Sequence, residues 1–255
     1  MTVQYDLDWL RIAENVSQEA GDYLRQGLAR SRQINFQDES DVKLQADLDS
    51  ENLIRKILSD RTQLPVIGEE KGGDPGLLST NSHFWVVDPL DGTYNYLRNQ
   101  PQTCVSIGLM QGTEFIGGVV YDFNRNELFS GSTEKPLSIN NEFITPRWAD
   151  ALNQACLMTG FPARMDCSEK SIRLFVNQVH KFKKVRMIGS AAIALSTVAS
   201  GRADAYFENS ICLWDIAAGA ALVKAAGGYI KLKPTDNPFV VDFWAAGREE
   251  WLPRN

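Results

Sequence analysis

The sequence contains few of the residues that bind zinc or form disulfide frameworks. Histidine occurs only twice in 255 residues, at His83 and His180, and the four cysteines are scattered without a CxxC pair. A multi-histidine metal site is therefore excluded, and a zinc centre is disfavoured because zinc prefers His and Cys ligands. Scattered cysteines in a chain of this length are typical of reduced, mostly buried thiols, so we expect a cytoplasmic protein.

Long hydrophobic stretches and runs of basic residues are also missing. No segment approaches the ~18 consecutive apolar residues of a membrane-spanning helix, and the N-terminus, MTVQYDLDWLRIAENV, is acidic where a signal peptide is basic. The formal net charge is −6, from 26 Lys and Arg against 32 Asp and Glu. We therefore expect neither a nucleic-acid nor a membrane partner. An acidic protein that binds a phosphorylated substrate needs cations to bring the two together.

Apolar spacing predicts a mixture of helices and strands. Helices are predicted over 6–30, 47–60, 168–182 and 215–228, and a strand that turns into a helix over 185–201. Strands are predicted over 64–68, 84–89, 202–209 and 228–233, with an antiparallel meander over 104–132. These elements do not alternate as regular βαβ units, so a layered α+β sandwich fits better than a barrel.

Acidic residues stand where three of the apolar elements begin or end. Glu69 and Glu70 follow the strand 64–68, Asp88 and Asp91 stand at the end of the strand 84–89, and Asp215 opens the last helix. Each alone has an ordinary interpretation as a loop charge, a turn residue or a helix N-cap. Together they favour a site, because clustered carboxylates repel one another unless protons or cations intervene.

The stretch Asp88 to Thr93, DPLDGT, contains the largest number of candidate ligand groups. Magnesium prefers hard oxygen ligands, and two such ions can hold both the attacking and the leaving oxygen of a phosphoryl transfer. Asp88 and Asp91 could each reach an ion, and the carbonyl of Leu90 faces the same space. Gly92 and Thr93 then offer backbone N–H groups at a helix start, where a phosphate is well placed. The stretch thus predicts metal ligands followed by a phosphate cradle.

Two long segments also carry a family resemblance. The segments are WVVDPLDGTYNYLR and WDIAAGAALVKAAGG, with GEE before them and GSAAIAL and ADAYFE between them. In this order and spacing they resemble the signature segments of the inositol monophosphatase family. The similarity runs from about Asp6 to the C-terminal strands.

The resemblance implies a fold and an activity. The implied fold is a five-layer αβαβα sandwich with mixed and antiparallel sheets, as one domain over 1–255. Within it, the N-terminal part, about 1–140, contains most metal ligands. The C-terminal part, about 141–255, contains Asp215 and the residues that line the substrate pocket. The implied activity is that of a magnesium-dependent, lithium-sensitive phosphomonoesterase, with two Mg²⁺ ions per site and a weaker third position. The implied state is a homodimer that acts on a small phosphorylated metabolite, inositol 1-phosphate by default.

The family's metal ligands carry over residue by residue. Glu69 corresponds to a ligand shared between the metals and the attacking water. Asp88 and the Leu90 carbonyl correspond to ligands of the first metal, and Asp91 to a ligand of two metals. Asp215 corresponds to a ligand of the second metal that also meets a substrate hydroxyl.

The resemblance assigns the remaining roles to the water and the substrate. Thr93 and Asp47 correspond to the pair that orients and deprotonates the attacking water, which then attacks phosphorus without a covalent enzyme intermediate. The N–H groups of Gly92 and Thr93 correspond to phosphate contacts. The residues that correspond to the side of the pocket facing the substrate hydroxyls are Ser190, Ala191 and Glu208.

Two positions depart from the family pattern. The family usually has V-T-x-x-D before its first acidic helix, and here Leu44 stands at the threonine position before Asp47. A lysine that often precedes that aspartate by some eleven residues is replaced by Phe36. Both changes lie beside the third, weaker metal position and bear on the role of Asp47.

Several alternatives stay open at this stage. The same scaffold hydrolyses histidinol phosphate, 3′-phosphoadenosine 5′-phosphate, fructose 1,6-bisphosphate and sugar 1-phosphates in relatives. Some family members act through protein partners, with catalysis dispensable. Two short motifs suggest other chemistry. DLDS at 47–50 is similar to the nucleophile motif of haloacid-dehalogenase phosphatases but lacks a hydrophobic strand before it. DFNRN at 122–126 is similar to the start of an EF-hand loop but lacks its glycine and is better explained as a hairpin turn.

Overall fold

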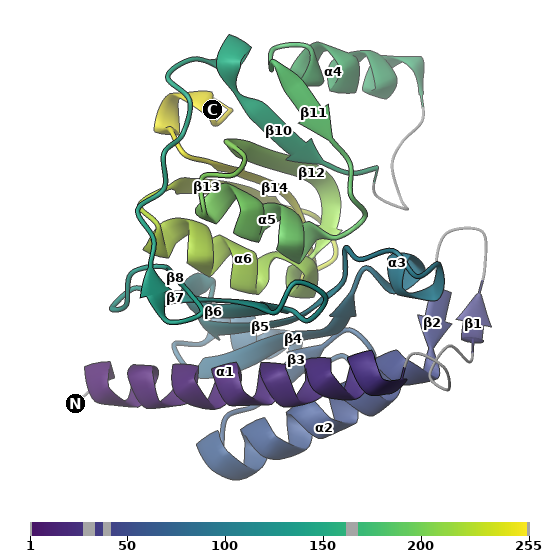
Figure 1. Ribbon diagram of the computed structural model, residues 1–255, viewed down its shortest axis with the longest axis vertical. Coiled ribbons are helices and arrows are strands. Elements are labelled where there is room, and N and C mark those ends of the chain that lie inside the picture. Colours follow the sequence, from purple (N-terminus) through teal and green to yellow (C-terminus); the bar gives the residue numbers. More distant parts are fainter. Residues whose placement is uncertain (1, 28–33, 38–41, 162–167, 254–255) are drawn as a thin grey trace.

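The computed structural model describes residues 2–27, 34–37, 42–161 and 168–253 of the chain. Their main helices and two larger sheets form five layers (Figure 1). The helices of the three helical layers, in the order of the layers, are α1 (Thr2–Gly27) with α2 (Gln45–Thr62), then α5 (Ala191–Ala199) with α6 (Leu213–Ala225), and finally α4 (Glu169–Val179). The predicted layered αβαβα sandwich is therefore confirmed.

Helices α1 and α2 form the first layer because each has one apolar face. The buried apolar side chains of α1 are spaced by three and four, as helical periodicity requires: Leu10, Ala13, Val16, Ala20 and Leu24. In α2, Ile54 and Leu58 are buried in the same way, and both helices pack with Trp85 and Val87 of the neighbouring sheet in one core cluster. Full burial of a leucine or isoleucine side chain contributes about 2 kcal/mol, so this face fixes both helices on the sheet.

The first large sheet has seven strands. Their order is β3 (Val66–Gly68), β4 (His83–Asp91), β5 (Cys104–Gln111), β6 (Glu114–Asp122), β7 (Glu127–Ser132), β8 (Ser138–Ile139) and β9 (Glu142–Phe143). Strands β3 and β4 run parallel, and all other neighbours run antiparallel. The predicted meander over 104–132 is thus confirmed as β5, β6 and β7.

The second large sheet has five strands. Their order is β11 (Lys184–Arg186), β10 (Cys156–Thr159), β12 (Ala205–Cys212), β14 (Val240–Ala246) and β13 (Tyr229–Pro234). Strand β10 runs parallel to both of its neighbours, and the other pairs are antiparallel. The outer face of this sheet meets α4, where the ring of Phe175 lies 5.7 Å from the ring of Phe207.

Small residues allow α6 to lie directly on the first sheet. A Cβ atom at Gly118 of β6 would lie 2.2 Å from the carbonyl oxygen of Ala218, so only glycine fits there. A Cβ atom at Gly108 of β5 would meet Ala217 at 2.8 Å. Helix α6 is therefore held between the two sheets with its N-terminal end fixed, and that end carries Asp215.

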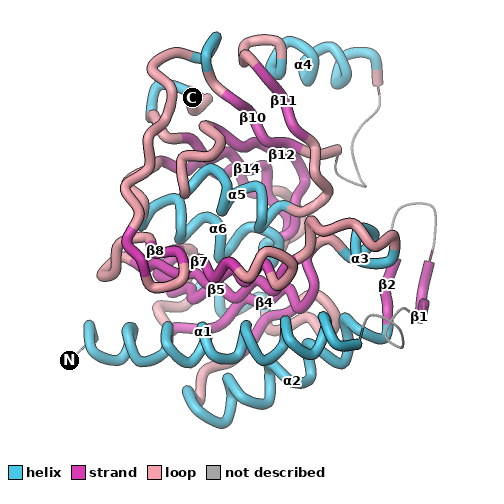
Figure 2. Tube along the Cα trace, in the orientation of Figure 1, coloured by secondary structure: helices cyan, strands magenta, loops and turns pink. Residues whose placement is uncertain are grey.

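Short elements complete the chain. A two-stranded sheet of β1 (Ile34–Gln37) and β2 (Val42–Leu44) lies beside the short helix α3 (Thr93–Leu97), as Figure 2 shows. Single 3₁₀ turns span Pro75–Ser79, Leu152–Gln154 and Glu249–Trp251. Within the described residues, no helix is both long and apolar enough to cross a membrane.

The structure corrects two local predictions. The strand predicted to end at Pro89 continues to Asp91, because the register with β5 shifts between Asp88 and Asp91 and leaves the proline out of the ladder. The helix predicted to open at Asp215 begins two residues earlier, at Leu213. His83 opens β4, and its ring lies 5.5 Å from the ring of Trp9.

Candidate active site

The irregular end of β4 places two carboxylates and a carbonyl group together. All residues from Phe84 to Asp91 are buried. The backbone N–H of Leu90 donates to Asp88 Oδ1 at 3.0 Å, and the carbonyl oxygen of Pro89 accepts from Ser50 Oγ at 3.0 Å. These bonds hold the bulge in one conformation, so Asp88, Leu90 and Asp91 have fixed places at the edge of the sheet.

Glu69 reaches the same place from β3, the parallel neighbour of β4. Its backbone N–H donates to the carbonyl oxygen of Val87 at 3.2 Å. The loop that follows is held by Glu51, whose side chain is fully buried and accepts from the N–H groups of Glu70 at 2.7 Å and Lys71 at 3.1 Å. Arg55 Nε pairs with Glu51 at 2.6 Å. The Glu51–Arg55 pair therefore positions the segment that carries Glu69.

Thr93 and Asp47 lie together although 46 residues separate them in the chain. Thr93 Oγ1 donates to Asp47 Oδ1 at 2.9 Å and also lies 3.1 Å from the carbonyl oxygen of Leu90. The other carboxylate oxygen of Asp47 accepts from the Leu44 N–H at 2.7 Å. Burial of Asp47 raises its pKa to about 7, while the bonds from Leu44 and Thr93 lower it.

Asp91 connects β4 to the start of α5. Its Oδ2 atom accepts from Ser190 Oγ at 2.7 Å and from the Ala192 N–H at 2.6 Å. Ser190 is the N-cap of α5 and also accepts from the Ile193 N–H, an arrangement that suits a serine at this position. Burial raises the pKa of Asp91 to about 6, and the hydrogen bonds from α5 oppose that rise.

Asp215 stands in the first turn of α6, and its Oδ2 accepts from the Cys212 N–H at 3.2 Å. It therefore helps to cap the helix from inside the first turn rather than as the N-cap itself. Trp214 beside it packs its ring 6.0 Å from that of Phe239. Trp214 thus packs against Phe239 at the start of the helix, beside Asp215.

The carboxylates repel one another. Burial raises the pKa of Glu69 well above its usual value, and the charges of Asp215, Asp47 and Glu70 raise it further, while Lys43 lowers it. Burial and then the charges of Glu69, Asp91 and Asp215 raise the pKa of Asp88 in the same way. These acids are close enough to resist ionising together, which is the condition under which a cation stabilises a cluster.

The donor set suits a hard divalent cation. Glu69, Asp88, Asp91 and Asp215 offer carboxylate oxygens and Leu90 offers a carbonyl oxygen, the ligand types that magnesium prefers. Within the described parts of the chain, no three His, Cys, Asp or Glu side chains are placed to hold one ion together. Binding of an ion therefore requires some of these side chains to turn toward a common centre.

A cavity of about 370 Å³ opens beside Asp91 and Asp215. Glu208 of β12 also lines it, and its carboxylate accepts from the Tyr206 hydroxyl at 2.8 Å. Burial raises the pKa of Glu208 to about 7. A Cβ atom at Gly160 would lie 2.5 Å from Glu208 Oε2, so the glycine makes room for this carboxylate. The other residues that line the cavity are Thr159, Phe161, Met187, Gly189, Ser190, Ala191 and Ile211.

The residues expected from the sequence therefore fall into two neighbouring groups. Asp91 and Asp215 belong to both groups, because they interact with the other acids and also line the cavity. Gly92, with φ +88°, is the N-cap of α3 and brings Thr93 to the helix start. The remaining members of the first group, which surrounds the acids, are Glu69, Asp88, Leu90, Asp47 and Thr93. The remaining members of the second group, which lines the cavity, are Ser190, Ala191 and Glu208.

The two departures from the family pattern have different consequences. Leu44 supplies only its backbone N–H to Asp47, a bond that does not depend on the side chain. Phe36 lies exposed on β1. Lys43, which the sequence did not single out, places its Nζ 3.0 Å from Glu70 Oε1 and so brings a positive charge to the acids. Its position next to Leu44 in the motif was the only available signal.

The two short motifs that suggested other chemistry, DLDS and DFNRN, have structural explanations. Asp47 and Asp49 of DLDS lie inside α2 rather than at the end of a buried strand. In DFNRN, Asp122 Oδ1 accepts from the N–H groups of Asn124 and Arg125 in the hairpin between β6 and β7. The expected hairpin turn is confirmed.

Comparison with known proteins decides the family. The model of the inositol monophosphatase family matches residues 7–242. The chain belongs to this family. Members of the inositol monophosphatase family are generally metal-dependent, and membership supports phosphatase activity.

Curated relatives carry two kinds of name. The chain is 34% identical over 238 residues to the Nus factor SuhB of Xylella fastidiosa, covering 91% of this chain and 85% of that protein. It is 34% identical over 239 residues to the inositol-1-monophosphatase of Mycobacterium bovis, covering 87% of this chain and 82% of that protein. Among solved structures, the inositol monophosphatase from Anabaena aligns with a TM-score of 0.79 at 29% identity, covering 96% of this chain and 92% of that chain.

Proposed function

We propose that this protein hydrolyses a small phosphomonoester, with inositol 1-phosphate as the substrate and magnesium as the metal. As parts of the same proposal, the protein is lithium-sensitive, cytoplasmic and homodimeric. The observation that carries the proposal is the contact of two groups at Asp91 and Asp215: mutually repelling carboxylates on one side, and a cavity that Glu208 also lines on the other.

The metal would be held by Glu69, Asp88, Asp91, Asp215 and the Leu90 carbonyl. When bound, divalent ions neutralise charge on the transferring phosphoryl group and on the leaving oxygen.

The remaining steps belong to side chains of the chain itself. Thr93 Oγ1 donates to Asp47, so its lone pairs can accept a hydrogen bond from a water molecule, and as the water proton passes to Thr93 Oγ1 the hydroxyl proton passes to Asp47. Asp47 has a pKa of about 7 and can exchange a proton near neutral pH. The pair therefore orients the attacking water and draws its proton away. The N–H groups of Gly92 and Thr93 bind phosphate oxygens at the start of α3.

Glu208 supports a hydroxylated leaving group. Its carboxylate faces the cavity that Asp91 and Asp215 also line, and an ionised carboxylate accepts hydrogen bonds from hydroxyl groups. Ser190 and Ala191 form the wall beside it. A ring with several hydroxyls, such as inositol, matches this lining, and so does the amine of histidinol phosphate.

Phosphate release tests the proposal directly. The purified protein is assayed with inositol 1-phosphate, histidinol phosphate, 3′-phosphoadenosine 5′-phosphate, fructose 1,6-bisphosphate and a sugar 1-phosphate, with magnesium, with EDTA and with added lithium. We expect the highest kcat/KM for inositol 1-phosphate, no turnover in EDTA and inhibition by lithium. Full activity in excess chelator would contradict the proposed metal dependence. A higher kcat/KM for another ester would contradict inositol 1-phosphate as the substrate.

The name of one relative favours a second candidate function. The Nus factor SuhB of Xylella fastidiosa is as similar to this chain as the inositol-1-monophosphatases are. A role through a protein partner, with catalysis dispensable, is therefore the alternative. Complementation of a deletion strain separates the two. Rescue by the Asp88→Asn variant would favour the partner role, and failure of that variant beside wild-type rescue would favour catalysis.

A further inference from the structure

Strand β12 contains an irregularity between the cavity and Asp215. Glu208 pairs with Phe243 of β14, and Ile211 pairs with Val241. Two residues of β12, Asn209 and Ser210, therefore stand opposite a single residue of β14, Asp242. This two-against-one arrangement is a β-bulge.

The bulge determines which side chains face the cavity. Side chains alternate along a strand, so residues three apart should point to opposite faces of the sheet. Glu208 and Ile211 are three apart, yet both line the cavity of about 370 Å³. The extra residue of the bulge shifts the alternation by one, so the side chain of Ile211 points to the same face of the sheet as that of Glu208. Without the bulge, Glu208 and Ile211 could not both face the substrate cavity.

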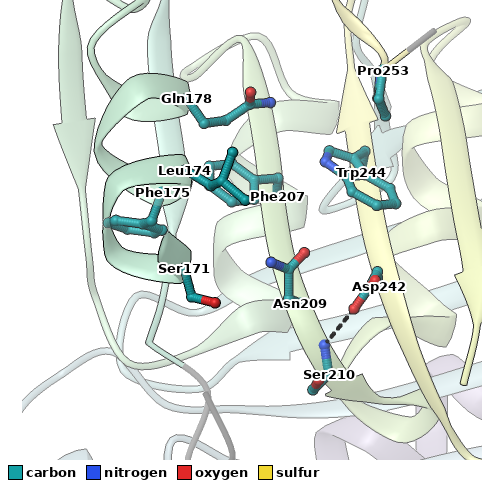
Figure 3. Close-up of a pocket in the computed structure, with 10 residues that line it drawn as sticks. All are labelled: Ser171, Leu174, Phe175, Gln178, Phe207, Asn209, Ser210, Asp242, Trp244 and Pro253. Carbon is teal, nitrogen blue, oxygen red and sulfur yellow. Dashed lines mark hydrogen bonds between the residues drawn. The ribbon is translucent and has the colours of Figure 1, made fainter. Parts of the chain in front are cut away.

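Asp242 holds the bulge through the backbone of Ser210. The N–H of Ser210 donates to Asp242 Oδ1 at 3.0 Å, a bond drawn in Figure 3. Ser210 has φ +55°, in the left-handed region that residues other than glycine rarely adopt. The hydrogen bond thus stabilises a backbone conformation that serine does not favour by itself.

Asp242 lies on the opposite face of the sheet from the substrate cavity. It lines a separate pocket of about 410 Å³ between the sheet and α4, together with Phe207, Asn209, Ser210 and Trp244 (Figure 3). Glu208 belongs to the inner cavity and not to this outer pocket. A substrate in the inner cavity therefore cannot touch Asp242, and any effect of Asp242 on that substrate passes through the bulge.

We propose that Asp242 is a positioning residue, which fixes the bulge at Asn209 and Ser210 and thereby aims Glu208 at the leaving group of the substrate. The inference rests on the proposed function, because it assigns to Glu208 the recognition of hydroxyl groups. It makes Asp242 a determinant of specificity from the far side of the sheet.

The first test separates KM from kcat. For Asp242→Ala we expect the KM for inositol 1-phosphate to rise about tenfold, as loss of one charged hydrogen bond predicts, with kcat within about twofold. Kinetics with 4-nitrophenyl phosphate, whose leaving group has no hydroxyls for Glu208, should not change. Asp236→Ala removes an exposed carboxylate from the loop before β14 and should match wild type with both esters.

The second test is rescue through the backbone. Glycine adopts φ +55° without a steric cost, so Ser210→Gly should return the Asp242→Ala variant to near the wild-type KM. A general loss of packing at Asp242 would not be repaired by this change. Equal KM values for the single and the double variant would overturn the proposal.

A third test asks whether Asp242 acts through Glu208. In a Glu208→Gln background, Asp242→Ala should raise KM no further, because the group it positions is already altered. Independent multiplication of the two effects would overturn the proposal. A crystal structure of Asp242→Ala in which Glu208 and the bulge keep their places would overturn it even if inositol 1-phosphate proves not to be the substrate. Failure of the wild type on that ester alone would instead contradict the proposed function.

Discussion

The Thr93 hydroxyl donates to Asp47 Oδ1 at 2.9 Å and joins the start of α3 to the start of α2. The same hydroxyl lies 3.1 Å from the Leu90 carbonyl oxygen, at the end of the strand that carries Asp88 and Asp91. A group that could handle a proton is thus fixed beside the acids.

Replacement of Thr93 should separate its hydroxyl from its shape. Thr93→Val keeps the size of the side chain and should lower kcat roughly 100-fold to 1,000-fold, as loss of an acid–base group does, with little change in KM. Thr93→Ser retains the hydroxyl and should keep most activity. Steady-state phosphate release measures both. Equal kcat values for the valine and serine variants would exclude a role for the hydroxyl.

Asp91→Asn should abolish turnover without unfolding the protein. The variant removes a ligand candidate but also removes one of several buried charges that repel each other. We expect activity below ~1% of wild type, together with an unchanged or higher melting temperature in EDTA at pH 8. Phosphate release and circular dichroism measure the two properties. A large fall in melting temperature would show that Asp91 is mainly structural.

The metal-free protein should lose stability as the pH rises from 5 to 8. The pKa values of Asp47 and Asp91 are raised from 3.8 to about 7 and about 6. The folded state thus keeps protons that the unfolded chain releases, so their contribution is full below about pH 4 and is lost through pH 6 to 7. Added magnesium should raise the melting temperature most at pH 8. Thermal unfolding in EDTA and in magnesium at both pH values checks this, and an equal magnesium effect at pH 5 and pH 8 would contradict it.

Glu51→Ala should both destabilise the fold and weaken magnesium binding. It leaves Arg55 Nε and the N–H groups of Glu70 and Lys71 without their acceptor, which costs roughly 3 kcal/mol. Urea unfolding measures the first effect and calorimetric titration of magnesium the second. Asp60→Ala, an exposed change on the same helix, serves as the control and should stay within about 0.5 kcal/mol. Magnesium affinity equal to wild type would show that the loop does not need this anchor.

Gly160→Ala should affect substrate recognition more than catalysis. The new methyl group would lie 2.5 Å from Glu208 Oε2 and must displace that carboxylate. We expect KM for inositol 1-phosphate to rise about tenfold, while the kinetics with 4-nitrophenyl phosphate stay unchanged. An unchanged KM for inositol 1-phosphate would indicate that Glu208 does not bind the leaving group.

Local sequence patterns were sufficient for the layers of the fold. The periodic apolar residues of α1 and the meander over 104–132 were predictable because burial on one face leaves a regular spacing. The bulge after Asp88 was not predictable in this way. Pro89 normally marks the end of a strand, and only pairing with β5 shows that the strand resumes at Asp91.

The candidate site was predicted mainly through resemblance, and the contacts that support it came from the structure. The acids at strand ends were visible in the sequence, and motifs gave each a role. The Glu51–Arg55 pair and Asp242 belong to no motif, because their effects depend on backbone groups from distant segments. Side chains that act on a neighbour's backbone leave little trace in a single sequence.

The burial of α6 between the two sheets has a consequence for how the protein acquires activity. Asp215 comes from that helix, whereas Asp88 and Asp91 come from a strand of the first sheet. A nascent or cleaved polypeptide lacking the C-terminal third would hold only part of the ligand set. Cation affinity would then report that assembly of the two halves is complete.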